Sequence, residues 1–293
     1  MWLINTETLR LEYFANPIKQ SYAILSHTWG DEEVSFHQMA DLKAARKMAG
    51  FAKIKTTCQL AKSRSLQYAW VDTCCIDKSS SAELSEAINS MFRWYEESTV
   101  CFAFLCDLTH SLEEPKCRWF RRGWTLQELL APRSVLFYDA SWRLVGDKAQ
   151  GTFCHILSTI TNIDYSVLKD CRHINSMPAG VRMSWAADRK TTRPEDTAYC
   201  MLGIFNISMP LLYGEGETAF IRLQEEICKQ NNDMSLFAWT QQANSKLWAQ
   251  YRGIFAFHPS EFLGLPEIDN TVGTRVCDTV PVCNPAIRIE FIS

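Results

Sequence analysis

The chain has 293 residues, 47% of them hydrophobic, and this length allows one large domain or two small ones. Its 30 basic and 33 acidic residues give a net charge of −3, so no excess of basic charge indicates a nucleic-acid partner or a polybasic membrane anchor. No apolar run approaches the roughly 20 residues that span a bilayer. Residues 1–7 lack the basic and apolar regions of a secretory signal, so we expect a cytoplasmic protein without a transmembrane segment.

The twelve cysteines lack the spacing of a zinc site. No two are separated by two residues and the six histidines are scattered, so we expect no metal and reduced thiols that pack as small apolar side chains. The vicinal pair Cys74–Cys75 admits an alternative, because a Cys75 thiolate with His27 as its base would be a nucleophilic dyad. No acyl-enzyme features surround this pair, which favours the structural interpretation.

Four short apolar runs have the pattern of buried strands. Thr99–Leu105 is apolar throughout, as expected where helices cover both faces of a parallel sheet. Helical patterns separate the runs, so strand and helix alternate through about residue 140. This alternation predicts an α/β fold with a doubly wound, flavodoxin-like parallel sheet flanked by helices. The four runs are Tyr22–Leu25, Tyr68–Asp72, Thr99–Leu105 and Ser134–Tyr138.

Helical patterns lie between these runs, and residues 1–20 are expected to be a lead-in without an element of its own. The first pattern covers about residues 41–63. The second begins at a capping box formed by Ser80 and Glu83. The third is the short helix within Arg122–Pro132. The apolar face of the second helix carries Leu84, Ile88, Met91 and Tyr95.

The second half of the chain has a different pattern of helices and then strands. Helices are expected at Phe153–Ile160, Glu195–Ile207 and Thr218–Lys229. Strand-like runs follow at Ser235–Trp239, Gly253–Phe257 and Ala286–Ile292. We therefore expect an α/β core over residues 1–145. Residues 146–293 are expected to be an α+β extension, helical and then β-rich, that packs on the core without a clear linker.

Polar and aromatic residues follow the expected strands at their carboxyl ends, which is where open parallel sheets bind ligands. A flavodoxin-like strand order brings these ends to one edge and predicts a small-molecule cleft there. His27 also fits an ordinary structural role, and Trp29 fits core packing as well as stacking on a base or a nicotinamide ring. The expected cleft residues are Ser26, His27, Trp29 and Gly30 after the first strand and Asp72 and Asp77 around the end of the second.

Glu128 lies on the short helix within Arg122–Pro132, directly before the last strand-like run. At about 100° per residue, the leucines of this helix share one face, whereas Glu128 lies near Trp124. Glu128 therefore points into a cleft or into bulk water, and an exposed helix glutamate is the alternative to a functional acid.

Two arginines are candidates for binding an anion such as a phosphate. Arg122 precedes the Glu128 helix, where the helix dipole disfavours a cation unless it serves an anion at the helix N-terminus. Arg189 lies in a charged stretch, residues 184–196, that a structural salt-bridge junction would also explain. Pro194 and the acids that follow it suit the first turn of a helix.

Several co-linear motifs together resemble the fungal heterokaryon incompatibility (HET) domain. They are YAILSHTWG at Tyr22–Gly30, WVDTCCID at Trp70–Asp77, the segment Ala87–Leu108 and RWFRRGWTLQELLAPRSVLFYD at Arg118–Asp139. Residues 183–217 look like the segment that commonly follows this domain. The resemblance implies an effector of non-self recognition that triggers cell death when genetically different fungal cells fuse. It also implies a NACHT/STAND-type or other incompatibility partner, whose domains are not visible in this sequence.

A more distant similarity concerns the Toll/interleukin receptor (TIR) domain. The order of strand, Trp-x-Leu-x-Glu-Leu helix and strand ending Phe-Tyr-Asp is similar to the TIR pattern, in which the glutamate of W-C-L-x-E-L cleaves NAD⁺. Trp124, Leu126, Glu128 and Leu129 match, and Thr125 replaces the cysteine. The resemblance implies that Glu128 is catalytic.

Two hypotheses therefore follow from the sequence. The first is an enzyme that cleaves NAD⁺ or a related nucleotide, with Glu128 beside the ribose, Trp29 or Trp124 holding the departing ring, and Arg122 or Arg189 holding the pyrophosphate. In this case NAD⁺ is a substrate and no cofactor is needed. The second is a non-catalytic module that signals by forming homo-oligomers. Polar side chains that converge at the strand ends favour the enzyme, because an adaptor would not need them.

Overall fold

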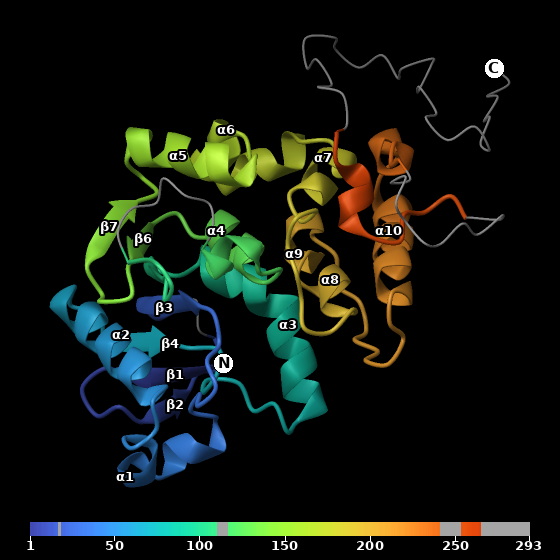
Figure 1. Cartoon of the computed structure of the whole chain (residues 1–293). Coiled ribbons are helices and arrows are strands. Elements are labelled where there is room, and N and C mark those ends of the chain that lie inside the picture. Colours follow the sequence, from blue (N-terminus) through green and yellow to red (C-terminus); the bar gives the residue numbers. More distant parts are fainter. Residues whose placement is uncertain (17–18, 110–116, 241–252, 265–293) are drawn as a thin grey trace, which may run out of the picture.

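A computed structural model describes residues 1–16, 19–109, 117–240 and 253–264 (Figure 1). Its centre is a seven-stranded mixed sheet in the order β2-β1-β4-β3-β5-β6-β7. The four middle strands are parallel, and β1, β2 and β7 extend the sheet with antiparallel pairs. The strands are β1 (Trp2–Asn5), β2 (Leu11–Tyr13), β3 (Tyr22–His27), β4 (Tyr68–Trp70), β5 (Val100–Phe104), β6 (Val135–Tyr138) and β7 (Leu144–Asp147).

The order of the parallel strands determines where a ligand would bind. Across the sheet, the four parallel strands lie in the order β4-β3-β5-β6, which is second, first, third and fourth in chain order. The chain adds β4 on one side of β3 and then β5 and β6 on the other side. The direction in which strands are added therefore reverses between β3 and β5. Such a reversal opens a crevice at the carboxyl ends of the strands. Ser26 and His27 pair with Ala103 and Phe104 of β5 but extend past Trp70, the last residue of β4. They therefore project at this edge.

Helices cover the sheet and continue through the second half of the chain. Within the core, α2 packs on β3 and β4, whereas α4 packs on β3 and on α3. Figure 1 shows α3 and α4 between the sheet and α8 and α9, and α9 contacts α3 directly. The helices are α1 (Leu42–Ala45), α2 (Phe51–Ser63), α3 (Ser81–Glu96), α4 (Thr125–Leu130), α5 (Gly151–Thr161), α6 (Tyr165–Lys169), α7 (Ala179–Ser184), α8 (Asp196–Tyr199), α9 (Leu202–Phe205) and α10 (Thr218–Gln230). Short 3₁₀ turns are η2 (His37–Ala40), η3 (Arg118–Arg121), η4 (Cys171–Ser176), η5 (Met234–Phe237) and η6 (Pro259–Phe262).

The α/β architecture and the four parallel strands confirm the expectation from the sequence, but the ends of the sheet differ from it. Residues 1–20 are not a lead-in, because β1 and β2 pair antiparallel within them and join the sheet through β4. These strands are too short to show a clear period of two. The edge strand β7 was also not expected, since Leu144 and its neighbours are partly exposed.

Two helices expected to be continuous are each divided into two. The helical pattern over residues 41–63 breaks at Gly50, whose backbone N–H bonds the Glu32 carbonyl oxygen at 2.9 Å. A Cβ at Gly50 would lie 2.5 Å from that oxygen, so glycine permits this close approach. Residues 195–207 form α8 and α9, and Asn206 ends α9 with a φ of 55°.

The expectation of a β-rich C-terminal region is wrong for the described residues. Residues 235–239 overlap the 3₁₀ turn η5, and Gly253–Phe257 is irregular. Their apolar residues hold the two segments together. For example, the Trp239 indole donates to the Ile254 carbonyl oxygen at 2.8 Å. Ala286–Ile292 lies outside the described residues.

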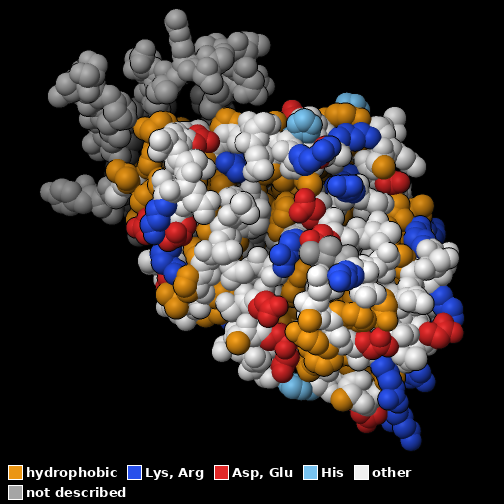
Figure 2. Space-filling model, turned by 180° about the vertical axis from the view of Figure 1, so that it is seen from behind, with side chains coloured by type: hydrophobic (Ala, Val, Ile, Leu, Met, Phe, Trp, Pro, Cys, Tyr) orange, Lys and Arg blue, Asp and Glu red, His pale blue; other side chains and the backbone are white. Residues whose placement is uncertain are grey.

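The surface carries mixed charge. Figure 2 shows one face, on which lysines and arginines are scattered among acidic, apolar and other side chains. Among the residues that the structure describes, no helix is long and apolar enough to cross a membrane. The same residues contain no group of three or more histidine, cysteine or acidic side chains placed to hold a metal ion.

Candidate active site

A cavity of about 440 Å³ lies at the carboxyl edge of the parallel sheet. The loops after β3 and β4 form one side of it, α3 contributes an apolar wall, and α4 contributes Glu128. Residues of the second half, between 192 and 213, complete its lining. This volume falls within the range of ordinary small-molecule sites. The lining residues used below are His27, Trp29, Asp72, Lys78, Arg122, Trp124, Thr125, Glu128, Arg193, Asp196 and Tyr213.

Glu128 is a buried member of this lining, with 6% of its surface exposed. Its carboxylate makes a short hydrogen bond with the Ser26 hydroxyl, which in turn accepts one from the Trp119 indole N–H at 2.8 Å. Burial raises the pKa of Glu128 to about 8, opposed by the bond to Ser26 and reinforced by the nearby charge of Asp72. The alternative of an exposed helix glutamate is therefore wrong.

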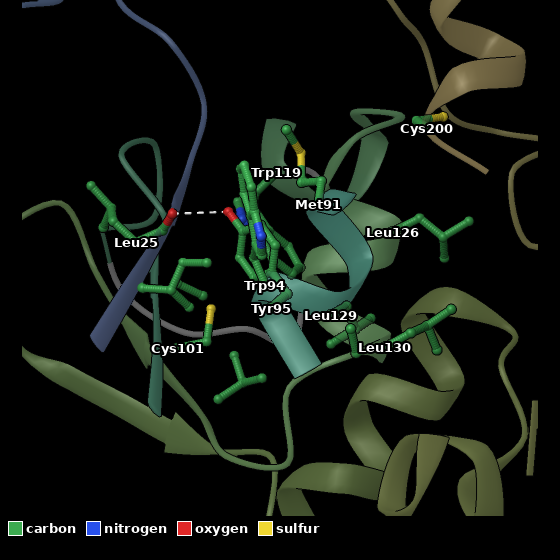
Figure 3. Close-up of a cluster of buried hydrophobic side chains, with 14 of the residues drawn as sticks. Leu25, Met91, Trp94, Tyr95, Cys101, Trp119, Leu126, Leu129, Leu130 and Cys200 are labelled. Carbon is green, nitrogen blue, oxygen red and sulfur yellow. Dashed lines mark hydrogen bonds between the residues drawn. The ribbon is translucent and has the colours of Figure 1, made fainter. Parts of the chain in front are cut away.

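The Tyr95 hydroxyl also lies beside Glu128 and contributes to its pKa. This hydroxyl is 3.0 Å from the Leu25 carbonyl oxygen and donates to it, as the dashed line in Figure 3 shows. The hydrogen bond between Tyr95 and Glu128 lowers the pKa of Glu128, so burial, and not Tyr95, raises this pKa.

Every residue of α4 is buried. The leucines of this helix pack into the core, whereas Glu128 lines the cavity. Figure 3 shows Leu126, Leu129 and Leu130 among the side chains of this core. At the carboxyl end of α4, the buried ammonium of Lys148 donates to the carbonyl oxygens of Leu129 at 2.8 Å and Pro132 at 2.5 Å. Burial lowers the pKa of Lys148 to about 8. This cation terminates the helix that carries Glu128.

We predict that Lys148→Met lowers the free energy of unfolding by about 2–3 kcal/mol, because it leaves buried carbonyl groups without a donor. Urea unfolding of the purified variant at pH 7 would measure the change. Lys47→Met, at an exposed lysine, is the matched control and should change the stability little. Equal stability of the two variants would show that Lys148 does not hold the end of α4.

His27 occupies an unusual position between two carboxylates. Its Nε2 is 3.7 Å from Oε1 of Glu33, and its Nδ1 is 3.8 Å from Oδ1 of Asp72. Both distances exceed hydrogen-bond length. The side chain is 1% exposed, and neither ring nitrogen has a hydrogen-bond partner among the described residues. Glu33 is also bound to Lys53 and to the Gly30 N–H. Burial raises the pKa of Glu33, but His27 and these two donors lower it further, to about 2.

Trp29 is half exposed at the cavity and is held by two contacts. Its indole N–H donates to Oδ2 of Asp72 at 2.7 Å. The Lys78 ammonium lies 3.8 Å from the centroid of its ring, within the range of a cation–π interaction. Because half of its surface is exposed, Trp29 is not part of the core, which was the alternative.

The structure brings most of the expected site residues together. His27, Trp29, Asp72, Arg122, Trp124 and Glu128 line the one cavity, and Ser26 binds Glu128 directly. Arg122 donates to the Thr192 hydroxyl at 3.3 Å. Besides Ser26, which does not line the cavity itself, three expected residues lie outside its lining: Gly30, Asp77 and Arg189.

Each of these three has another role in the structure. Gly30 bonds Glu33 through its backbone. Asp77 accepts hydrogen bonds from Ser79 in the loop before α3. Arg189 is buried and lines a neighbouring cavity of about 550 Å³. Its guanidinium donates to the Arg122 carbonyl oxygen and to the Thr125 hydroxyl, both at 3.0 Å, so it holds α4 and does not face the main cavity. The proposed dyad partner Cys75 is buried and does not line the cavity either.

Sequence reasoning missed the groups that surround Glu128. The Trp119 indole and the Tyr95 hydroxyl look like apolar packing in the sequence, and only their polar tips reach the site. Arg193, Asp196 and Tyr213 were also missed, because they lie in the expected extension. The apolar face of α3 was a usable signal, since Leu84, Ile88 and Met91 of that face line the cavity.

Comparisons with known proteins identify the family. Residues 22–116 match the family model described as "Heterokaryon incompatibility protein (HET)", and residues 218–252 match a domain of unknown function, DUF8212. The Vegetative incompatibility protein HET-E-1 of Podospora anserina is 41% identical over 239 residues, which is 77% of this chain and 17% of that protein. The chain thus spans 17% of the length of this curated relative. No solved structure matches the chain. On the family model and the 41% identical relative, the chain belongs to the heterokaryon incompatibility (HET) family.

Proposed function

We propose that this HET protein acts in vegetative incompatibility and induces cell death by cleaving NAD⁺ or a related nucleotide at the bond between nicotinamide and ribose. One observation carries the proposal: the buried carboxyl of Glu128 shares a cavity with Trp29, Asp72 and Arg122 at the carboxyl edge of the parallel sheet. The HET-E-1 relative, named a vegetative incompatibility protein, supports the biological role.

The strand order adds support for a TIR-like mechanism. The four parallel strands follow the second-first-third-fourth order of flavodoxin-like sheets, and Glu128 lies where such sheets bind ligands. The likeness to TIR domains rests on this order and on the Trp124–Leu129 motif.

The proposed reaction needs a negative charge beside the ribose. The C1′–N bond breaks with its electron pair passing to nicotinamide, which leaves as a neutral molecule, and positive charge develops on the ribose. The Glu128 carboxylate stabilises this charge, and water then adds to C1′ and releases a proton, giving ADP-ribose. The positive charge of the bound nicotinamide ring favours the ionised form of Glu128 over the protonated form of the free protein.

The surrounding residues of the cavity would orient the dinucleotide. The exposed face of Trp29 suits the departing ring. The guanidinium of Arg122 suits a phosphate group. The walls formed by α3 and α4 exclude bulk water from Glu128, which strengthens its interaction with the ribose.

The leaving group provides the test of this proposal. The purified chain is incubated with NAD⁺ or with NADH, and nicotinamide and ADP-ribose are separated by chromatography. We expect cleavage of NAD⁺ and none of NADH, because a dihydronicotinamide would have to leave as an anion. The assay is run over a wide range of protein concentrations, so that a requirement for self-association is tested as well. Absence of NAD⁺ cleavage at all of them would reject the enzyme and favour an oligomerising module.

A further inference from the structure

The cavity contains two cation–aromatic pairs, one from each half of the chain. In the first pair, the Lys78 ammonium lies 3.8 Å from the centroid of the Trp29 ring. In the second pair, the Arg193 guanidinium lies 4.4 Å from the centroid of the Tyr213 ring. All four side chains line the same cavity. In each pair the cation lies over one face of the ring, so the pair combines an aromatic ring for stacking with a positive charge for a phosphate.

The Tyr213 ring is held in place by several contacts. Its hydroxyl donates to Oδ1 of Asp196 at 3.0 Å, and its ring meets that of Tyr199 edge-to-face at 5.4 Å. It precedes a turn in which Gly214 has a φ of +107°, a conformation that other residues rarely adopt. Glu195 accepts the N–H of Gly214 at 2.8 Å, which ties this turn to the start of α8. Tyr213 is therefore an oriented part of the cavity wall.

This wall is joined to the helix that carries Glu128. The Lys190 N–H donates to the Arg121 carbonyl oxygen at 2.6 Å, and the Gly123 N–H donates to the Lys190 carbonyl oxygen at 3.0 Å. A Cβ on Gly123 would lie 2.5 Å from the side chain of Thr191, so glycine permits this approach. The start of α4 and the segment before Arg193 thus form one unit.

The contacts of Glu128 distinguish the two ends of the cavity. Glu128 bonds the hydroxyl of Ser26, which lies three residues before Trp29. The indole N–H of Trp29 donates to Asp72. Asp196 is instead bound to Tyr213 and interacts with Trp124. Glu128 therefore belongs to the Trp29 end, and the pair of Arg193 and Tyr213 forms the other end.

We infer that Tyr213 and Arg193 bind the adenosine-phosphate end of a dinucleotide whose scissile bond lies between Glu128 and Trp29. The inference rests on the proposed function and deepens it, because it selects a dinucleotide over a mononucleotide. A dinucleotide has two ring systems joined by a pyrophosphate, and the cavity has two aromatic rings, Trp29 and Tyr213, that each have a cation over one face. The second half of the chain then determines which nucleotide is bound.

Calorimetric titration of the full chain tests this assignment. Glu128→Gln is the parent protein, so that ligands are not cleaved, and the ligands are NAD⁺, ADP-ribose and nicotinamide mononucleotide. Tyr213→Leu and Arg193→Met should each raise the Kd for NAD⁺ and ADP-ribose about tenfold, but change that for nicotinamide mononucleotide less than about twofold. Tyr213→Phe keeps the ring and should keep the affinity. Arg172→Met, at an arginine with an 82% exposed side chain, is the control.

The outcomes separate this inference from the proposed function. If NAD⁺ binds but neither Arg193→Met nor Tyr213→Leu weakens it, the assignment of Tyr213 and Arg193 is wrong and the proposed function stands. The same holds if NAD⁺ and nicotinamide mononucleotide weaken equally. If the parent protein binds none of the three ligands, both proposals are rejected. Arg193 is exposed, so Arg193→Met decides the matter even if Tyr213→Leu does not fold.

Discussion

Glu128→Gln is expected to lower the kcat of the proposed NAD⁺ cleavage by about a thousandfold, because it removes the carboxylate that we propose to stabilise the positive charge on the ribose. Glutamine preserves the size of the side chain and can still bond the Ser26 hydroxyl. The loss should therefore appear in kcat, with little change in KM. Nicotinamide release under substrate saturation measures kcat directly.

Two further variants make this result specific to the Glu128 carboxylate. Glu128→Asp keeps the charge but draws it back by one methylene, so it should retain more activity than Glu128→Gln. Glu225→Gln removes an exposed glutamate of α10 and should behave as wild type. A folded Glu128→Gln protein with more than about a tenth of the wild-type kcat would rule out a catalytic carboxylate at this position.

The stability of the wild-type protein is expected to fall as the pH rises from about 5 to 8. The pKa of Glu128 is raised from 4.5 to about 8 in the folded protein, chiefly by burial. Between these values the folded protein holds a proton that the unfolded chain has released, so the free energy of unfolding decreases by about 1.4 kcal/mol per pH unit. Below pH 4.5 and above pH 8 this group contributes no slope.

Urea unfolding at pH 5.5, 6.5 and 7.5 tests the expected slope. Subtracting the Glu128→Gln curve from the wild-type curve isolates Glu128 from other groups that titrate. The measurements stay below pH 8 because the pKa of Lys148 is lowered to about 8 in the folded protein. Above pH 8, Lys148 therefore makes the free energy of unfolding rise with pH, which is opposite to the effect of Glu128. Parallel curves for the two proteins would show that Glu128 is ionised in the fold. If Glu128→Gln is more stable than the wild type but inactive, burial of the Glu128 carboxyl group lowers the stability of the wild-type protein.

The central sheet was predictable because its strands are buried on both faces. Such strands have continuous apolar runs, and Thr99–Leu105 contains the whole of β5. The edge strands were not predictable, since β2 and β7 are short and partly exposed and have no strong pattern. Pairing with a neighbour stabilises them, and one sequence does not reveal which neighbour that is.

The site was predictable to the extent that strand ends meet at one edge. This argument placed Ser26 and Asp72 near Glu128, and helical geometry separated Glu128 from the leucines of α4. The argument did not reach Arg193 or Tyr213, because contacts between distant segments depend on how the second half packs. It also misplaced Arg189, since a guanidinium that holds a helix and one that holds a phosphate look the same in a sequence.

The position of Tyr213 in the chain has a consequence for the synthesis of the protein. The four parallel strands and the Glu128 helix are complete by residue 138, but the cavity wall that contains Arg193 and Tyr213 is not. Chains grow from the N-terminus at about 5–20 residues per second, so a nascent core waits several seconds for this wall. The cavity cannot form while the chain is still short. The proposed reaction is thereby withheld until translation has passed residue 213.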